Sequence, residues 1–133
     1  MEITPSAHAA ALWVGLHLIL LLVLSVLVVR QRQQHHVVIG DGGVPALTQA
    51  IRAFGNATEY VPTGLIGLTV LALAGASPLL VHVLGGALFV GRAAHAVGLS
   101  RSGESSLPRT VGVVLTWVAY IATAVALIFY AIP

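Results

Sequence analysis

One uninterrupted apolar stretch constrains this chain more than any other feature. From Ala9 to Val29 the sequence runs AAALWVGLHLILLLVLSVLVV without a charged side chain. A helix of about 20 apolar residues spans a hydrocarbon core of roughly 30 Å, so this stretch predicts a membrane-spanning helix. The composition indicates that the whole chain is a membrane protein, because 58% of its 133 residues are hydrophobic and 8% are charged. A soluble domain has about a quarter charged residues, so a soluble fold is excluded.

Three further apolar segments follow the first, and the polar segments between them are short. We expect spans at about residues 8–30, 46–75, 79–99 and 109–131. Spans of this length use up nearly the whole chain and leave no room for a separate soluble domain. The sequence therefore predicts a single transmembrane domain over residues 1–133, an all-α integral membrane protein built as a four-helix bundle.

The arginines predict how this bundle sits in the membrane. An even number of spans brings both termini to one side and the two polar loops, residues 31–45 and 100–108, to the other. Arginines flank the loop side at four positions: Arg30, Arg32, Arg101 and Arg109. Positively charged loops face the cytoplasm, so we expect both termini outside and the loops inside.

Composition also excludes several kinds of function. The chain has no cysteine, which excludes disulfides, thiolate metal sites and a cysteine nucleophile. A net charge of +2 is too small for a nucleic-acid interface. The six histidines suggest haem, but His82 and His95 lie about 20 Å apart along one helix axis and on different faces. We therefore expect neither haem nor a metal.

Ionisable side chains inside predicted spans are costly and mark candidate functional sites. Arg52, Asn56 and Glu59 follow one another at spacings of four and three residues, which places them on one stripe of a helix. One interpretation is a structural network near the membrane surface, in which Arg52 and Glu59 compensate each other through Asn56 or a neighbouring helix. The other is a binding surface for a small zwitterionic ligand. Arginine grips a carboxylate, glutamate accepts from an ammonium group, and asparagine pairs with a peptide amide.

Four other side chains are candidates at the same end of the bundle. Tyr60 follows the stripe directly, and an interfacial anchor is its alternative role. Arg92 and His95 lie one turn apart near the end of the third span, where a snorkelling arginine beside a carbonyl-bonded histidine is the structural alternative. Arg109 opens the fourth span, a position where arginine also serves membrane topology.

The segment RAFGNATEYVP, residues 52–62, resembles the signature of the MAPEG family, the membrane-associated proteins in eicosanoid and glutathione metabolism. The family pattern is an arginine, an asparagine four residues on, a glutamate three further and a proline soon after. The segment GRAAH, residues 91–95, resembles the third-helix motif of the prostaglandin E synthase branch. Arg109 falls where the family carries an arginine at the start of its fourth helix. The resemblance covers essentially the whole chain and is greatest to the bacterial branch.

The resemblance implies a homotrimer that binds glutathione between neighbouring subunits near the cytoplasmic side. The positions that match the glutathione site are Arg30, Arg52, Asn56, Glu59, Tyr60, Arg92 and His95. Arg109 matches the arginine that activates the thiol, since a cation beside sulfur favours the thiolate. The loop of residues 100–108 is one residue longer than in the prostaglandin synthase branch, so Arg101 is the alternative for this role.

The predicted function is therefore a membrane-bound glutathione transferase or glutathione-dependent peroxidase in a bacterial inner membrane. Its partners would be glutathione, membrane lipids and a lipophilic electrophile or hydroperoxide that arrives from the bilayer. The alternative is a non-catalytic lipid-binding or scaffold protein of the same fold, as the lipoxygenase-activating member of the family is. The presence of Arg109 and of the complete polar stripe favours the enzyme.

Overall fold

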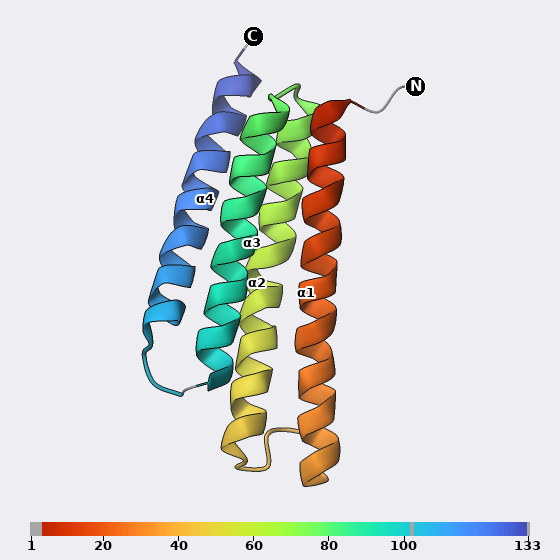
Figure 1. The fold of residues 1–133 in the computed structure, drawn as a ribbon, viewed down its shortest axis with the longest axis vertical. Helices are drawn as coiled ribbons and strands as arrows, with labels where there is room; N and C mark the ends of the chain where they lie inside the picture. Colours follow the sequence, from red (N-terminus) through yellow and green to blue (C-terminus); the bar gives the residue numbers. More distant parts are fainter. Residues whose placement is uncertain (1–3, 102, 133) are drawn as a thin grey trace.

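A computed structural model describes residues 4–101 and 103–132, and this part of the chain is helical and contains no strand. The helices are α1 (Pro5–His35), α2 (Pro45–Leu73), α3 (Pro78–Arg101) and α4 (Leu107–Ala131). They run alternately up and down in one bundle, with both chain ends at one end and the α1–α2 and α3–α4 loops at the other (Figure 1). The prediction of an all-α fold with four helices is thus confirmed.

The helix boundaries depart from the expected spans chiefly at the loop end. α1 continues past residue 30 to His35, so the first part of the expected loop at 31–45 is helical. The polar residues there include glutamine and arginine, which are good helix formers, and α1 stops where His36 takes a left-handed conformation with φ of 53°. The Arg32 guanidinium then ties down the shortened loop by donating to the Gly40 carbonyl at 2.9 Å.

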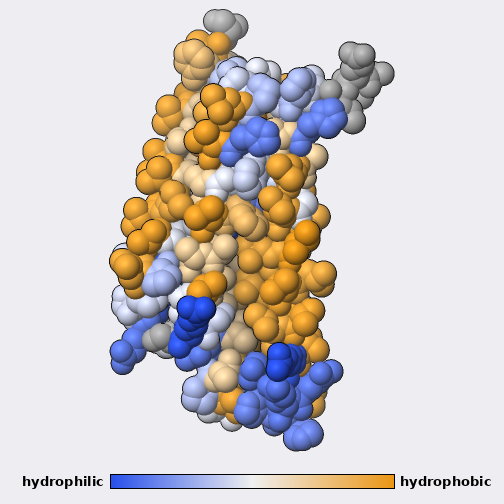
Figure 2. Space-filling model, viewed as in Figure 1, coloured by the Kyte–Doolittle hydropathy of each residue, from blue (hydrophilic) through white to orange (hydrophobic). Residues whose placement is uncertain are grey.

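Three helices in the described part of the chain are long and apolar enough to cross a membrane, namely α1, α3 and α4. α2 is equally long and packs against α1, α3 and α4, but it is not in this group. Its N-terminal half carries the polar stripe of Arg52, Asn56 and Glu59. Figure 2 shows hydrophobic side chains over most of the visible face, with strongly hydrophilic ones gathered at the loop end. That α2 also spans the membrane stays a prediction.

α3 and α4 approach each other through glycine. A Cβ atom added to Gly112 of α4 would lie 2.5 Å from the backbone nitrogen of His95 and 2.6 Å from the carbonyl oxygen of Gly91, both on α3. A Cβ atom added to Gly98 would lie 2.7 Å from the backbone nitrogen of Arg109. Small residues allow such close backbone contact between membrane helices. These glycines therefore set the position of the first turns of α4 relative to the end of α3.

Candidate functional site

A polar cleft of about 280 Å³ lies between α2, the end of α3 and the start of α4. Its lining residues are Ile51, Arg52, Gly55, Asn56, Glu59, His95, Leu99 and Arg109. A second cavity of about 330 Å³ shares Arg52, Leu99 and Arg109 and adds Thr48, Gln49 and Gly103. Five of the residues singled out from the sequence thus meet at one place, although they come from three different helices.

The α2 stripe faces this cleft with its charged groups available. Arg52 and Glu59 are exposed and Asn56 is half-buried. Within residues 4–101 and 103–132, neither Arg52 nor Glu59 has a hydrogen-bond or ion-pair partner. The structural alternative of a network linking the three side chains is therefore not formed. A guanidinium and a carboxylate lie on either side of an amide along the same wall of the cleft.

Arg92 lies behind the cleft and does not line it. Its side chain is 1% exposed, and its Nε donates to the Thr116 hydroxyl at 2.8 Å. Its Nη1 donates to Oδ1 of Asn56 at 2.8 Å, and the guanidinium carbon lies 4.7 Å from the centre of the Tyr60 ring, which is cation–π geometry. Arg92 therefore reaches the cleft through Asn56. No carboxylate pairs with it in the part of the chain that the structure describes.

His95 and Arg109 are joined across the α3–α4 contact. Nδ1 of His95 lies 3.0 Å from the carbonyl oxygen of Arg109. A carbonyl oxygen only accepts, so this nitrogen carries the proton and donates. In the neutral form of the imidazole, Nε2 is then the acceptor. Arg109 itself is half-buried and lines both cavities, and its side chain makes no hydrogen bond or ion pair with a described residue.

Two of the remaining candidates lie away from the cleft, and a third is packed beneath it. Arg30 is exposed near the end of α1 and is not among the residues that line the cleft. Arg101 is exposed at the end of α3 and lines neither cavity, so the geometry favours Arg109 over Arg101 as the cation at the site. Tyr60 is half-buried, and its ring packs edge-on against Tyr120 with centroids 5.9 Å apart.

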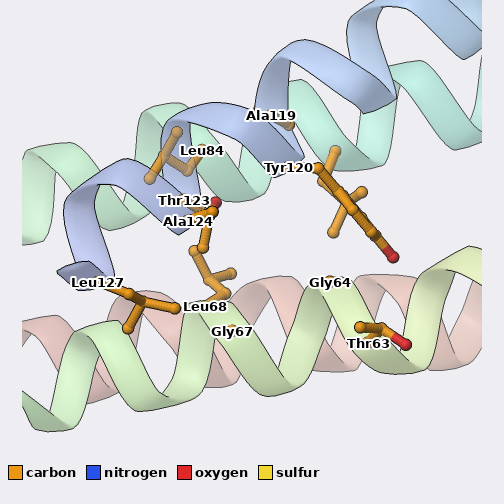
Figure 3. Close-up of a pocket in the computed structure, with 11 residues that line it drawn as sticks. Thr63, Gly64, Gly67, Leu68, Leu84, Ala119, Tyr120, Thr123, Ala124 and Leu127 are labelled. Atoms are coloured by element: carbon orange, nitrogen blue, oxygen red, sulfur yellow. The ribbon is translucent and has the colours of Figure 1, made fainter.

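An apolar cavity of about 170 Å³ lies farther along α2 and α4. Gly64 and Gly67 leave space on the α2 side, and Leu84 of α3 and Leu127 of α4 line it (Figure 3). Figure 3 shows Tyr120 extending from α4 toward α2 at one end of this cavity. Because the Tyr120 hydroxyl donates to the backbone carbonyl of Tyr60, this side chain divides the apolar cavity from the polar site.

Sequence reasoning missed three residues that contribute to the site. Gln49 lines the second cavity one helical turn before Arg52, and its spacing to the stripe was a usable signal. Thr116 and Tyr120 give no such signal, because a threonine and a tyrosine are unremarkable in an apolar helix. Their roles depend on which face of α4 turns toward α2 and α3. In the described chain, no group of three or more His, Asp or Glu side chains is placed to hold a metal ion.

These features define an all-helical membrane protein with a polar cleft between three of its helices. The chain belongs to the MAPEG family, whose pattern it matches over residues 10–129. It is 36% identical over 121 residues to the inner membrane protein YecN of Escherichia coli strain K12, an alignment that covers 91% of each chain. Its identity and coverage to YecN of Escherichia coli O6:H1 are the same. The resemblance noted in the sequence is therefore confirmed at the level of the family.

Proposed function

We propose that this protein is a membrane-bound glutathione transferase or glutathione-dependent peroxidase. The observation that carries the proposal is the cleft in which Arg52, Asn56, Glu59, His95 and Arg109 converge. Two of its charged side chains, Arg52 and Glu59, have no partner among the described residues and are free to bind a zwitterion. Membership of a family named for glutathione metabolism supports this choice of ligand.

The α2 stripe would hold the peptide. Arg52 would bind a carboxylate of glutathione through its paired N–H groups, and Glu59 would accept from the ammonium group. Asn56 lies between them and would bind the peptide backbone, with Tyr60 supporting Asn56 through Arg92. These contacts use opposite charges at the two ends of the stripe, which matches a ligand that carries both charges.

Arg109 would activate the thiol. A guanidinium beside the sulfur lowers the pKa of the thiol and so favours the thiolate, which is the reactive nucleophile. The thiolate then attacks an electrophilic carbon, forming a carbon–sulfur bond while the leaving group departs with the bonding electron pair. In the peroxidase version the thiolate sulfur attacks a hydroperoxide oxygen and breaks the O–O bond, forming the sulfenic acid of glutathione and releasing an alkoxide that takes up a proton to become the alcohol. The thiol of a second glutathione then attacks the sulfenic sulfur, forming glutathione disulfide and releasing water. No cysteine of the protein is needed in either reaction, and the sequence contains none.

The lipophilic substrate would lie against the apolar cavity between α2 and α4. This cavity is lined mostly by glycine, leucine and alanine, with Thr63 and Thr123 among them, and Tyr120 lies at its end nearest the polar site. An apolar substrate from the bilayer could reach it without passing through water. The same observation supports the second candidate function, a non-catalytic lipid-binding or scaffold protein, in which the cavity holds an acyl chain and the polar cleft holds no reacting thiol.

We also propose that the working unit is a homotrimer in a bacterial inner membrane with the cleft on the cytoplasmic side. Arg30 lies on the edge of the bundle formed by α1, and its own chain does not bring it to the cleft. A neighbouring copy could supply it. The name of the YecN relative supports the inner membrane, and the arginines at the loop end, including the half-buried Arg32 and the exposed Arg101, support the orientation. Light scattering of the detergent-solubilised protein measures the number of copies.

Titration of the purified protein with glutathione tests the proposal, with thiolate absorbance followed near 240 nm at neutral pH. We expect a thiolate signal that saturates with glutathione in the wild type. It should be lost in Arg109→Ala while calorimetry still detects binding, and it should be retained in the matched control Arg101→Ala. Binding without thiolate in the wild type would contradict the enzyme and favour the scaffold. No binding at all would contradict glutathione as the ligand.

A further inference from the structure

We infer that a chain of hydrogen bonds from Gly112 through Thr116 and Arg92 fixes the Asn56 side chain as a hydrogen-bond donor toward the cleft. Thr116 and Arg92 are then positioning residues, and Asn56 selects a ligand that offers a carbonyl oxygen at this point. The inference rests on the proposed function for the identity of the ligand. The hydrogen-bonded chain itself is a property of the protein and can be tested without the ligand.

The first link is the Thr116 hydroxyl, which is fully buried. It donates to the Gly112 carbonyl at 2.8 Å, within its own helix. A hydroxyl has a single proton, and the Gly112 carbonyl uses it. Toward Arg92 the hydroxyl can therefore only accept, and Nε of Arg92 donates to it at 2.8 Å. The direction of both bonds is fixed by chemistry and does not depend on where hydrogens are drawn.

The second link is the contact between Arg92 and Asn56. A guanidinium has donors and no acceptor, so the atom of Asn56 that lies 2.8 Å from Nη1 must be the carbonyl oxygen. An amide whose oxygen is held in this way turns its NH₂ group to the other side. Asn56 lines the cleft, so that group is the one available to a ligand. A ligand group that binds there must accept a hydrogen bond.

Because Asn56 acts as a donor, the ligand group that binds at the middle of the stripe must be an acceptor. Arg52 and Glu59 lie four residues before and three residues after Asn56, at the two ends of the stripe. A peptide bound along the stripe has both carbonyl and N–H groups near Asn56. The NH₂ group of Asn56 can donate to a peptide carbonyl but cannot accept from a peptide N–H. The geometry assigns the carbonyl of a peptide bond to Asn56.

The charge of Arg92 makes the assignment testable with a conservative change. Arg92 is buried without a carboxylate partner in the described chain, and its Nη2 has no hydrogen-bond partner. Asn56→Asp keeps the shape of the side chain and gives Arg92 an opposite charge. It also replaces the NH₂ group with a second oxygen. We expect the thermal unfolding temperature of Asn56→Asp to equal or exceed that of the wild type.

Calorimetric titration of these variants with glutathione tests the donor role. We expect Asn56→Asp to lower the affinity by about tenfold or more, because two acceptor oxygens would face each other. Affinity equal to or tighter than that of the wild type would overturn the assignment, since it would mean that Asn56 accepts from the ligand. The folded state is checked in the same samples by thermal unfolding.

A double-mutant cycle tests whether Thr116 acts through Asn56. Thr116→Val should lower the affinity several-fold, whereas Thr116→Ser and the matched surface variant Thr69→Val should bind like the wild type. In an Asn56→Ala background Thr116→Val should cause no further loss. An equal loss in both backgrounds would overturn the positioning role, because a merely structural effect would persist without Asn56.

A ligand-free measurement separates this inference from the proposed function. In a ¹⁵N spectrum the Nε–H of Arg92 should give a slowly exchanging signal in the wild type and in Thr116→Ser, and that signal should move or vanish in Thr116→Val. An unchanged signal in Thr116→Val would overturn the hydrogen-bonded chain. If the wild type fails to bind glutathione while the signal behaves as expected, the proposed function fails and the chain of hydrogen bonds stands.

Discussion

The close contact between α3 and α4 at Gly112 predicts that one methyl group there disables the site. In Gly112→Ala the new Cβ atom would lie 2.5 Å from the His95 nitrogen and 2.6 Å from the Gly91 oxygen, where 3.4 Å is the start of ordinary contact. Both obstructing atoms are backbone atoms, so rotation of a side chain cannot relieve the clash. The helices must separate by roughly 1 Å.

Separation of α3 and α4 would lower both the stability of the protein and the activity of the site, and the loss of activity would be the larger effect. Overpacking of this kind destabilises a protein by about 1–3 kcal/mol. Gly112 lies one turn after Arg109, so the separation also moves Arg109 away from His95 and from the cleft. A displacement of about 1 Å in a catalytic group costs roughly a hundredfold in rate. We therefore expect a lower unfolding temperature and a much larger loss of thiolate signal or turnover.

The assay compares thermal unfolding in detergent with thiolate absorbance at saturating glutathione. Gly15→Ala is the matched control, because a Cβ atom added there would have nothing within 4 Å other than its chain neighbours and the nearby backbone of its own helix. That change should leave the site intact and stabilise α1 by up to about 1 kcal/mol through helix propensity. If Gly112→Ala and Gly15→Ala gave the same unfolding temperature and the same signal, the reasoning from helix contact would be refuted.

Two other changes test the stripe and the first loop. Glu59→Gln should weaken glutathione binding by about tenfold, measured by calorimetry, because it removes the charge that would face the ammonium group; unchanged affinity would assign the stripe a structural role. Asp41 accepts from the Gly43 N–H at 3.1 Å and from the Thr48 hydroxyl at 3.0 Å, and these bonds lower its pKa below the ordinary 3.8. Its contribution to stability is therefore complete above pH 3.8 and is lost as the pH falls through the lowered pKa in the folded protein. Thermal unfolding from pH 7 to 3 should show an acid-dependent loss that is smaller in Asp41→Asn, and identical profiles would contradict the assignment.

The helices follow from hydropathy, while their ends depend on local chemistry. The chain changes from apolar to polar at Arg30, but α1 continues to His35 because a polar segment of glutamine and arginine can still form a helix. The point where the sequence changes from apolar to polar indicates the edge of the hydrocarbon region. It does not report where backbone hydrogen bonding ends, and the loop expected at 31–45 was too long for this reason.

The site was predictable where its residues share one helix. The spacing of Arg52, Asn56 and Glu59 fixes their common face, and the structure places all three on one wall of the cleft. Their meeting with His95 and Arg109 depends on how α2, α3 and α4 are rotated about their axes, which spacing within one helix does not determine. The family resemblance supplied that information.

Arg92 shows the limit of reasoning from position alone. It lies one turn from His95 on α3, so both were expected in the pocket, yet only His95 lines the cleft. The difference arises because Thr116 offers Arg92 a buried acceptor on α4 and Asn56 offers another on α2. A long flexible side chain adopts the conformation in which its N–H donors find acceptors. The acceptors for Arg92 lie on other helices, so the three-dimensional structure is needed to identify them.

α2, which contributes the polar stripe to the cleft, has the composition least suited to a lipid environment. Among the described helices, α2 is long enough to span a membrane but is the one not apolar enough to be counted as a span, and its polar residues include Arg52, Asn56 and Glu59. Unpaired charge within a membrane helix is costly, and no ion pair in the described chain offsets it. A purely structural α2 would be more stable with alanine or leucine at these positions. The proposed zwitterionic ligand would neutralise both Arg52 and Glu59 and would account for a stripe that packing alone does not require.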